Sequence, residues 1–116
     1  MPGNIMGVVS YDLYFWYQAI NDDIDEVLED LADGNARWVV AHPSVLAFRE
    51  ALLDRLPQLK DVISPGEGSS DATSHAILTL PFPWVKHEPE ILELVARHGL
   101  SGWDPQSESP LGHQAI

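Results

Sequence analysis

Cysteine is absent from this chain of 116 residues, and basic residues are scarce, with six lysines and arginines against eighteen aspartates and glutamates. The absence of cysteine excludes disulfides, thiolate nucleophiles and cysteine-ligated metal sites. The formal net charge of −12 argues against direct contact with nucleic acid or with an anionic membrane. A well-solvated acidic surface is the ordinary interpretation of such a charge. The same charge also favours a basic protein partner, because opposite charges accelerate encounter.

Long apolar runs are missing too. No stretch of the sequence approaches the ~20 apolar residues that a membrane-spanning helix needs, and the first residues lack the basic and apolar regions of a signal peptide. We therefore expect a cytoplasmic protein that contacts no membrane. The length suits a single domain, which we place at residues 6–105 between flexible tails at 1–5 and 106–116, with Met6 as a candidate native start.

Motifs for catalysis and metal binding are also lacking. The five histidines show neither the His-x-His nor the His-x-x-x-His spacing that is typical of paired metal ligands. No serine lies in a Gly-x-Ser-x-Gly nucleophile elbow. The glycine-rich segment 65–71 has no lysine and does not lead into a predicted helix, so it is typical of a loop between strands rather than of a phosphate-binding loop. We predict no metal, no cofactor and no catalytic residues.

The segment 10–18, Ser-Tyr-Asp-Leu-Tyr-Phe-Trp-Tyr-Gln, is dense in aromatic residues, which favours a strand. Side chains alternate along a strand, so Leu13 and Phe15 share one face, which we call the aliphatic face. The opposite, aromatic face carries Asp12, Tyr14 and Trp16. Because both faces are too apolar for a sheet edge, we place this strand at the centre of a sheet.

Three segments show the apolar periodicity of helices. The first is 22–33, where Asp23 and Glu26 form a capping-box pattern and Gly34 ends the helix. The second is 43–56, which lies between two prolines. The third begins around Pro89 and ends before Gly99.

Three more strands are predicted, at 60–64, 75–82 and 100–104. With the first two helices counted as one crossover, the element order is βαββαβ. Right-handed crossovers and a central first strand then give an antiparallel sheet of order 4-1-3-2 with the helices on one face, the ferredoxin-like α+β sandwich. We expect one core with these members: Leu13, Phe15, Leu28, Leu31, Phe48, Leu52, Leu78, Leu80, Ile91, Leu94 and Val95.

The aromatic face, left open in this arrangement, is the candidate site. Its predicted ligand- or partner-binding residues are Asp12, Tyr14, Trp16, His75, Thr79 and Trp103. Exposed aromatic rings of this kind usually mark a partner or ligand surface, although the tail or the segment 35–42 could instead fold over them. Asp12 and His75, on adjacent strands, could form an acid–base pair. Two half-exposed polar side chains are the more ordinary interpretation, since no nucleophile accompanies them.

Several short motifs resemble a family of small bacterial, often actinobacterial, proteins. They are Ser-Tyr-Asp-Leu-Tyr-Phe-Trp at 10–16, Pro43-Ser44 with Phe48 and the segment 52–57, Ala96-Arg97-His98-Gly99-Leu100, and Asp104-Pro105-Gln106-Ser107. The resemblance spans roughly residues 11–107 and implies a ferredoxin-like fold. Some members of that family resemble immunity proteins, which neutralise toxins. The chain departs from the family at Gly102-Trp103, where we expect a smaller apolar residue followed by an aromatic.

These observations favour a non-enzymatic binding protein, an immunity- or antitoxin-like factor whose basic partner, a toxin for example, docks on the open aromatic face. A homodimer formed through that face is the other form of association that we expect. The alternative is a small-molecule-binding domain, or a cofactor-free enzyme or resistance protein of secondary metabolism, with its pocket on the same face.

Overall fold

The computed structural model describes residues 10–66 and 68–112, and expectations for 1–9, 67 and 113–116 lie outside them. Its strands and α-helices are, in chain order, β1 (Ser10–Trp16), α1 (Ile24–Ala32), α2 (Pro43–Arg55), β2 (Ile63–Ser64), β3 (His75–Pro81), α3 (Glu88–Arg97), β4 (Ser101–Asp104) and β5 (Ser109–Gly112). Short 3-10 helices occupy Pro57–Asp61, Ser70–Thr73 and Phe82–His87. Each predicted helix and strand therefore has a counterpart, although the strand expected at 60–64 is reduced to two residues by the 3-10 turn before it.

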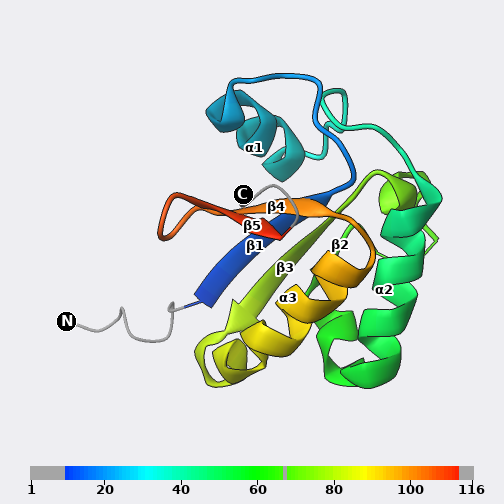
Figure 1. Cartoon of the computed structure of the whole chain (residues 1–116), viewed down its shortest axis with the longest axis vertical. Coiled ribbons are helices and arrows are strands. Elements are labelled where there is room, and N and C mark those ends of the chain that lie inside the picture. Colours follow the sequence, from blue (N-terminus) through cyan, green and yellow to red (C-terminus); the bar gives the residue numbers. More distant parts are fainter. Residues whose placement is uncertain (1–9, 67, 113–116) are drawn as a thin grey trace.

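The strands form one antiparallel sheet of order β2-β3-β1-β4-β5, with β1 central as predicted (Figure 1). The four-stranded order 4-1-3-2 is wrong for this sheet, because residues 109–112, which we expected in a flexible tail, form a fifth strand beside β4. Read from β4 inward, the remaining strands do follow as β4, β1, β3 and β2. The observed architecture is α+β and compatible with a ferredoxin-like fold.

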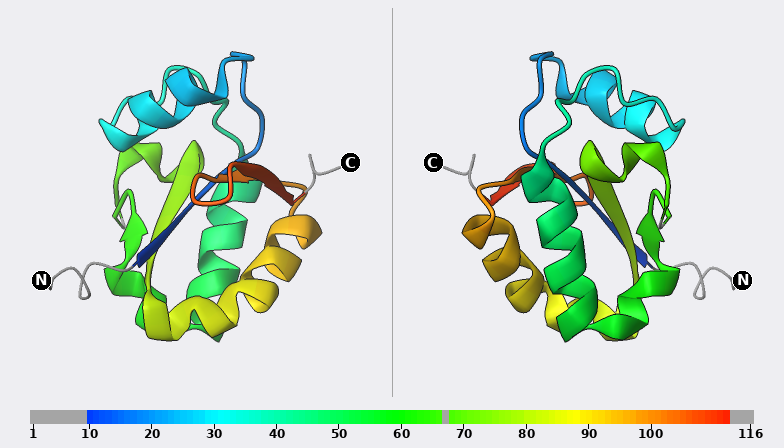
Figure 2. Two further views of the ribbon diagram at one scale, coloured as in Figure 1. Left: turned by 90° about the vertical axis from the view of Figure 1, so that its left-hand side faces the viewer. Right: turned by 90° about the vertical axis from the view of Figure 1, so that its right-hand side faces the viewer.

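The helices cover both faces of the sheet, not one. α2 and α3 lie against the aliphatic face, where Leu13, Phe15 and Leu78 pack against Phe48 and Val95 in the main core. α1 lies across one end of the opposite face, apart from α2 and α3 (Figure 2). The predicted core residues are buried except Leu28, which is half-buried, but Leu28 and Leu31 belong to a second cluster under α1. The expectation of all helices on one face is therefore wrong for α1.

α1 takes this position because Trp16 and Ile77 would otherwise leave large apolar side chains in water. Val27 and Leu31 from α1 and Val39 from the segment after it complete the cluster. The two chain segments that flank α1 are also paired to each other: Ile20 N–H donates to Trp38 O at 2.8 Å, and Val40 N–H donates to Gln18 O at 2.9 Å. The segment 35–42 therefore does cover part of the aromatic face, together with α1, as one of the two expectations had it; residues 113–116 of the tail lie outside the described residues.

Caps set the helix boundaries. The Asp23 side chain caps α1 by accepting from the backbone N–H groups of Asp25 and Glu26. The Glu26 carboxylate does not complete the predicted capping box, because it accepts from Asn21 Nδ2 at 2.9 Å instead. α2 is capped by His42, whose Nδ1 accepts from Ser44 N–H at 3.0 Å. Histidine is not a usual cap, and sequence patterns alone did not identify it.

A glutamine side chain continues the β1–β4 ladder where β4 turns away. The Asp12 N–H donates to Gln106 Oε1 at 2.8 Å, and Gln106 Nε2 donates to Asp12 O at 3.1 Å. Asp104 fixes the conformation of this glutamine, because the Asp104 Oδ1 accepts from the Gln106 N–H at 2.9 Å and also from Gln106 Nε2. The Asp104-Pro105-Gln106-Ser107 motif is therefore a structural bracket between β1 and β4, not a flexible tail.

Gln106→Ala should lower the free energy of unfolding by about 1 kcal/mol, because two backbone hydrogen-bonding groups of Asp12 lose their partner. Urea unfolding followed by fluorescence measures the change. Gln18→Ala, at an exposed glutamine, is the matched control and should change stability by less than about 0.5 kcal/mol. Equal stability of the Gln106 variant and the wild type would show that water replaces the bracket without cost.

Candidate functional site

The six predicted site residues do share one face of the sheet, as the strand register shows. Asp12 lies opposite Thr79 and Trp16 lies opposite His75 on β3, while Tyr14 lies opposite Trp103 on β4. Cross-strand partners point to the same face. The structure therefore brings these residues onto one surface, in three rows along β1.

The rows differ in how accessible they are. Trp16 is 1% exposed and His75 is 3% exposed, so the row under α1 belongs to the protein interior and the expectation of exposed partner-binding side chains is wrong for both. Tyr14 and Trp103 are half-buried, and burial together with the nearby Asp12 carboxylate raises the pKa of the Tyr14 hydroxyl. Asp12 is half-buried and Thr79 is exposed at the end that α1 does not reach.

Asp12 and His75 do not form an acid–base pair. Their positions are four residues apart along the β1–β3 ladder, which at ~3.3 Å per residue is roughly 13 Å. Direct proton transfer needs heavy atoms within about 3 Å. The interpretation as two half-exposed polar side chains is confirmed for Asp12 and is wrong for His75, which is buried.

His75 is instead a buried structural histidine. Its Nδ1 is 2.7 Å from the Ser74 hydroxyl, which donates its own proton to Asp71 O at 2.8 Å. The hydroxyl has one proton, so Nδ1–H must be the donor of the first bond. Burial lowers the pKa of His75 to about 4; the Asp71 carboxylate acts against this shift and the Arg49 guanidinium adds to it.

An accessible hollow remains beside the buried row, between the N-terminal end of α1 and β4. We call it the tryptophan hollow; it has a volume of about 540 Å³. Its lining consists of Trp16, Tyr17, Gln18, Ala19, Asn21, Asp22, Ile24, Ser101 and Trp103. Trp16 is the buried part of this lining. Trp103 and Ile24 also line a second hollow of about 410 Å³, together with Asp25 and Glu108. A half-buried indole ring, that of Trp103, beside the carboxylate of Asp22 is a combination that suits cations.

The surface around the tryptophan hollow is acidic and partly apolar. Residues 22–33 contain seven carboxylates, and the one basic residue nearby in sequence, Arg37, is bound to Asp30 with Nε and Oδ2 2.8 Å apart. Tyr17 and Ile20, which connect β1 to α1, are 37% and 61% exposed. Sequence reasoning missed Ser101, Asp22 and this connecting segment, because small polar residues and a short turn carry no motif.

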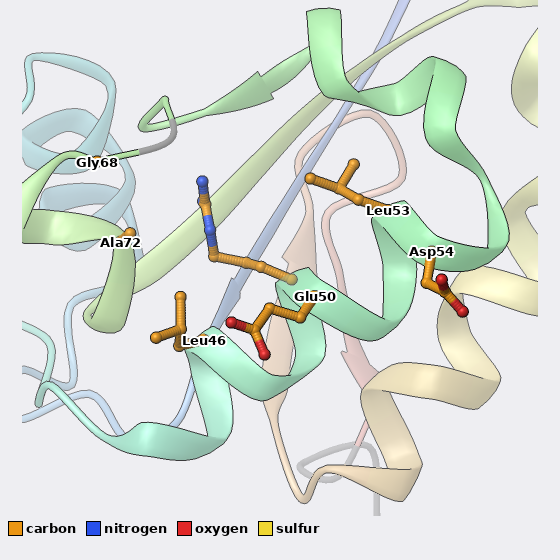
Figure 3. A pocket seen from close by; sticks show the side chains of 7 residues that line it. Leu46, Glu50, Leu53, Asp54, Gly68 and Ala72 are labelled. Carbon is orange, nitrogen blue, oxygen red and sulfur yellow. The ribbon is translucent and has the colours of Figure 1, made fainter.

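Another hollow, of about 500 Å³, lies along α2. Figure 3 shows Leu46, Glu50 and Leu53 of α2 on one side of it and Gly68 and Ala72 on the other. Arg49 also lines this hollow; its guanidinium is buried and donates to Pro65 O at 2.5 Å. That bond ties α2 to the loop after β2, so we assign the arginine a structural role.

Within residues 10–66 and 68–112, no three histidine, aspartate or glutamate side chains gather closely enough to hold a metal ion. Of the helices that the structure describes, none is long and apolar enough to cross a membrane. Comparison with family models, with curated proteins and with solved structures finds no match to this chain.

Trp16→Ala should destabilise the protein by about 3–5 kcal/mol, as much as Phe15→Ala does, because both rings are fully buried. Urea unfolding of both variants measures the two losses. Thr79→Ala, at an exposed position on the same face, is the control and should have little effect. A Trp16 variant that is nearly as stable as the wild type would mean that α1 does not cover this ring in solution.

Stability should fall as pH decreases from about 6.5 toward 4. The unfolded chain protonates His75 near the ordinary value of 6.5, whereas the folded chain keeps it neutral down to about 4. The unfolded state therefore binds more protons in this window, and the loss should be on the order of 2–3 kcal/mol. His75→Gln should remove this part of the slope in urea unfolding at a series of pH values. His87→Gln, at a half-buried histidine, controls for loss of an imidazole; the same slope in wild type and His75→Gln would contradict the assignment.

Proposed function

We propose that this protein is a non-enzymatic binding protein whose acidic α1 surface receives a basic protein partner, in the manner of an immunity or antitoxin-like factor. The observation that carries the proposal is the concentration of carboxylates: seven of the eighteen acidic residues lie in 22–33. A field of this kind accelerates encounter with a basic surface. The family resemblance and the ferredoxin-like assignment point in the same direction and remain proposals.

Helix stability alone does not account for these carboxylates. Asp23, Asp25 and Glu26 lie at the N-terminal end of α1, where the helix dipole favours negative charge. Glu29 and Asp33 lie toward the C-terminal end, where the dipole disfavours it, and the last turn contains no basic residue. Carboxylates at those positions weaken the isolated helix, and a basic partner would reverse this effect.

Apolar contacts next to the acidic surface would hold the partner after encounter. Tyr17 and Ile20 are exposed large hydrophobic side chains that lie just before α1. Binding energy at protein interfaces concentrates in such apolar and aromatic anchors, whereas rim charges mainly set the association rate. The docking surface proposed here therefore shifts from the open sheet to α1 and its N-terminal flank.

The alternative function, a small-molecule-binding domain or cofactor-free enzyme, is less well supported. It requires a pocket on the open aromatic face, and α1 covers the row of that face with the largest side chains. The tryptophan hollow has a suitable volume. Its acidic rim, however, favours a cationic group over the neutral or anionic substrates of most small-molecule enzymes.

Capture from a lysate of the source organism, followed by purification of the captured protein, tests the proposal. A triple variant removes three of the seven carboxylates in 22–33. Its substitutions are Asp22→Asn, Asp25→Asn and Glu29→Gln. A control variant with the same charge change lies on the other side of the molecule: Asp54→Asn, Asp61→Asn and Glu93→Gln. We expect the α1 variant to slow association with the purified partner by at least tenfold at low salt and the control variant by less than threefold.

The salt dependence and the identity of the partner decide the outcome. Raising ionic strength should slow association with the wild type far more than with the α1 variant. Rescue of growth when this protein is expressed with the partner would support the immunity role. An acidic partner, or equal binding by both variants, would contradict the proposal.

A further inference from the structure

One polar side chain of the tryptophan hollow, that of Ser101, makes no hydrogen bond to the residues that the structure describes. Ser101 is 9% exposed, lies opposite Trp16 on the aromatic face and lines the hollow. Among the described residues, its hydroxyl has no hydrogen-bond partner. The oxygen is not one of the fully enclosed side-chain atoms without a partner, so it is reached from the hollow and can bond to whatever enters, water or a ligand. The Ser101 hydroxyl is therefore a polar contact for a ligand, and this contact does not depend on the acidic surface.

The charges around the hollow specify a cation. Asp22 lines it directly, and Asp25 and Glu108 line the neighbouring hollow on the other side of Trp103. The helix N-terminus, which would otherwise favour an anion, is occupied by the capping carboxylate of Asp23. An anionic ligand would face several uncompensated carboxylates, whereas a cation would be neutralised by them.

The rings and acceptors favour a guanidinium over an ammonium. A guanidinium is planar, weakly hydrated and stacks on indole faces, and its N–H groups form a fork that reaches several acceptors at once. Trp103 offers a half-buried ring, and Asp22, Ser101 and Gln18 offer oxygen acceptors around it. A strongly hydrated ammonium would use fewer of these groups.

We propose that the tryptophan hollow binds one arginine side chain of the basic partner. The guanidinium stacks on Trp103 and donates to the Asp22 carboxylate and the Ser101 hydroxyl. The inference rests on the proposed function, because it names the residue type through which the partner anchors beside α1. It also explains why the hollow combines a buried aromatic side chain with an acidic rim.

Titration with three blocked tripeptides tests the arginine site. The probes are acetyl-Gly-Arg-Gly-amide, the same peptide with lysine, and the same peptide with citrulline, which has the shape of arginine without its charge. The readout is the indole N–H resonances of the four tryptophans in nitrogen-15 NMR spectra, assigned with Trp103→Leu. We expect the arginine peptide to shift the Trp103 resonance, to bind at least threefold more tightly than the lysine peptide, and to exceed citrulline by tenfold or more.

Variants locate the site. Asp22→Asn and Ser101→Ala should each weaken binding of the arginine peptide by about threefold or more, and Trp103→Leu should abolish it. Asp61→Asn is the control for charge and should leave binding unchanged. Folding of every variant is checked by the dispersion of its remaining amide resonances, so loss of binding is not confused with loss of structure.

The outcomes separate this inference from the proposed function. Equal binding of arginine and citrulline, tighter binding of lysine, or no effect of Asp22→Asn would overturn the arginine site. The basic partner could still be captured through the α1 surface in each of those cases. Capture that fails while the arginine peptide binds as expected would instead contradict the protein-binding function and leave the guanidinium site in place.

Discussion

The structure depends on burial of both faces of β1. Leu13 and Phe15 on one face and Trp16 on the other are fully or almost fully buried, so the sheet needs a cover on each side. α2 and α3 provide a broad cover for the aliphatic face, whereas α1 and the segment after it cover only one end of the aromatic face. Burial of a large apolar side chain is worth about 1.5–3 kcal/mol. Two backbone hydrogen bonds join the segments on either side of α1. Burial of apolar side chains, rather than these two bonds, is therefore the main interaction that holds α1 against the sheet.

Alternation along the strands predicted the faces, and it could not predict their covers. The period of two correctly predicted that Phe15 and Trp16 lie on opposite faces of the sheet. The register confirms that His75 and Thr79 share the aromatic face. The stripe of Val27 and Leu31 shows that α1 buries one side, but an amphipathic helix fits either face of a sheet equally well. β5 was missed because its four residues include Pro110, which disfavours an inner strand. The Gln106 bracket is a side chain replacing backbone pairing, and no sequence period records such a replacement.

The candidate site was predicted in its residues more than in its availability. Trp16 and Trp103 both line the tryptophan hollow, as their positions on adjacent strands of one face allow. Whether such rings face solvent, however, depends on where α1 packs, and the alternation along the strands does not determine that. His75 shows the same limit. Its place on the face was predictable, but its low pKa arises mainly from burial, with a smaller contribution from the Arg49 guanidinium of α2 and against the opposing effect of the Asp71 carboxylate.

The location of charge on α1 links the stability of this helix to binding. Pairs of carboxylates four residues apart, such as Asp25 with Glu29 and Glu26 with Asp30, repel one another by about 0.2–0.5 kcal/mol each. α1 is thus held to the sheet by a small apolar cluster while its outer surface works against it. A cation bound at its edge would reduce that repulsion, and by linkage it would favour the conformation in which α1 covers Trp16. α1, which covers part of the aromatic face, is therefore also the helix through which binding of a basic partner would stabilise the fold.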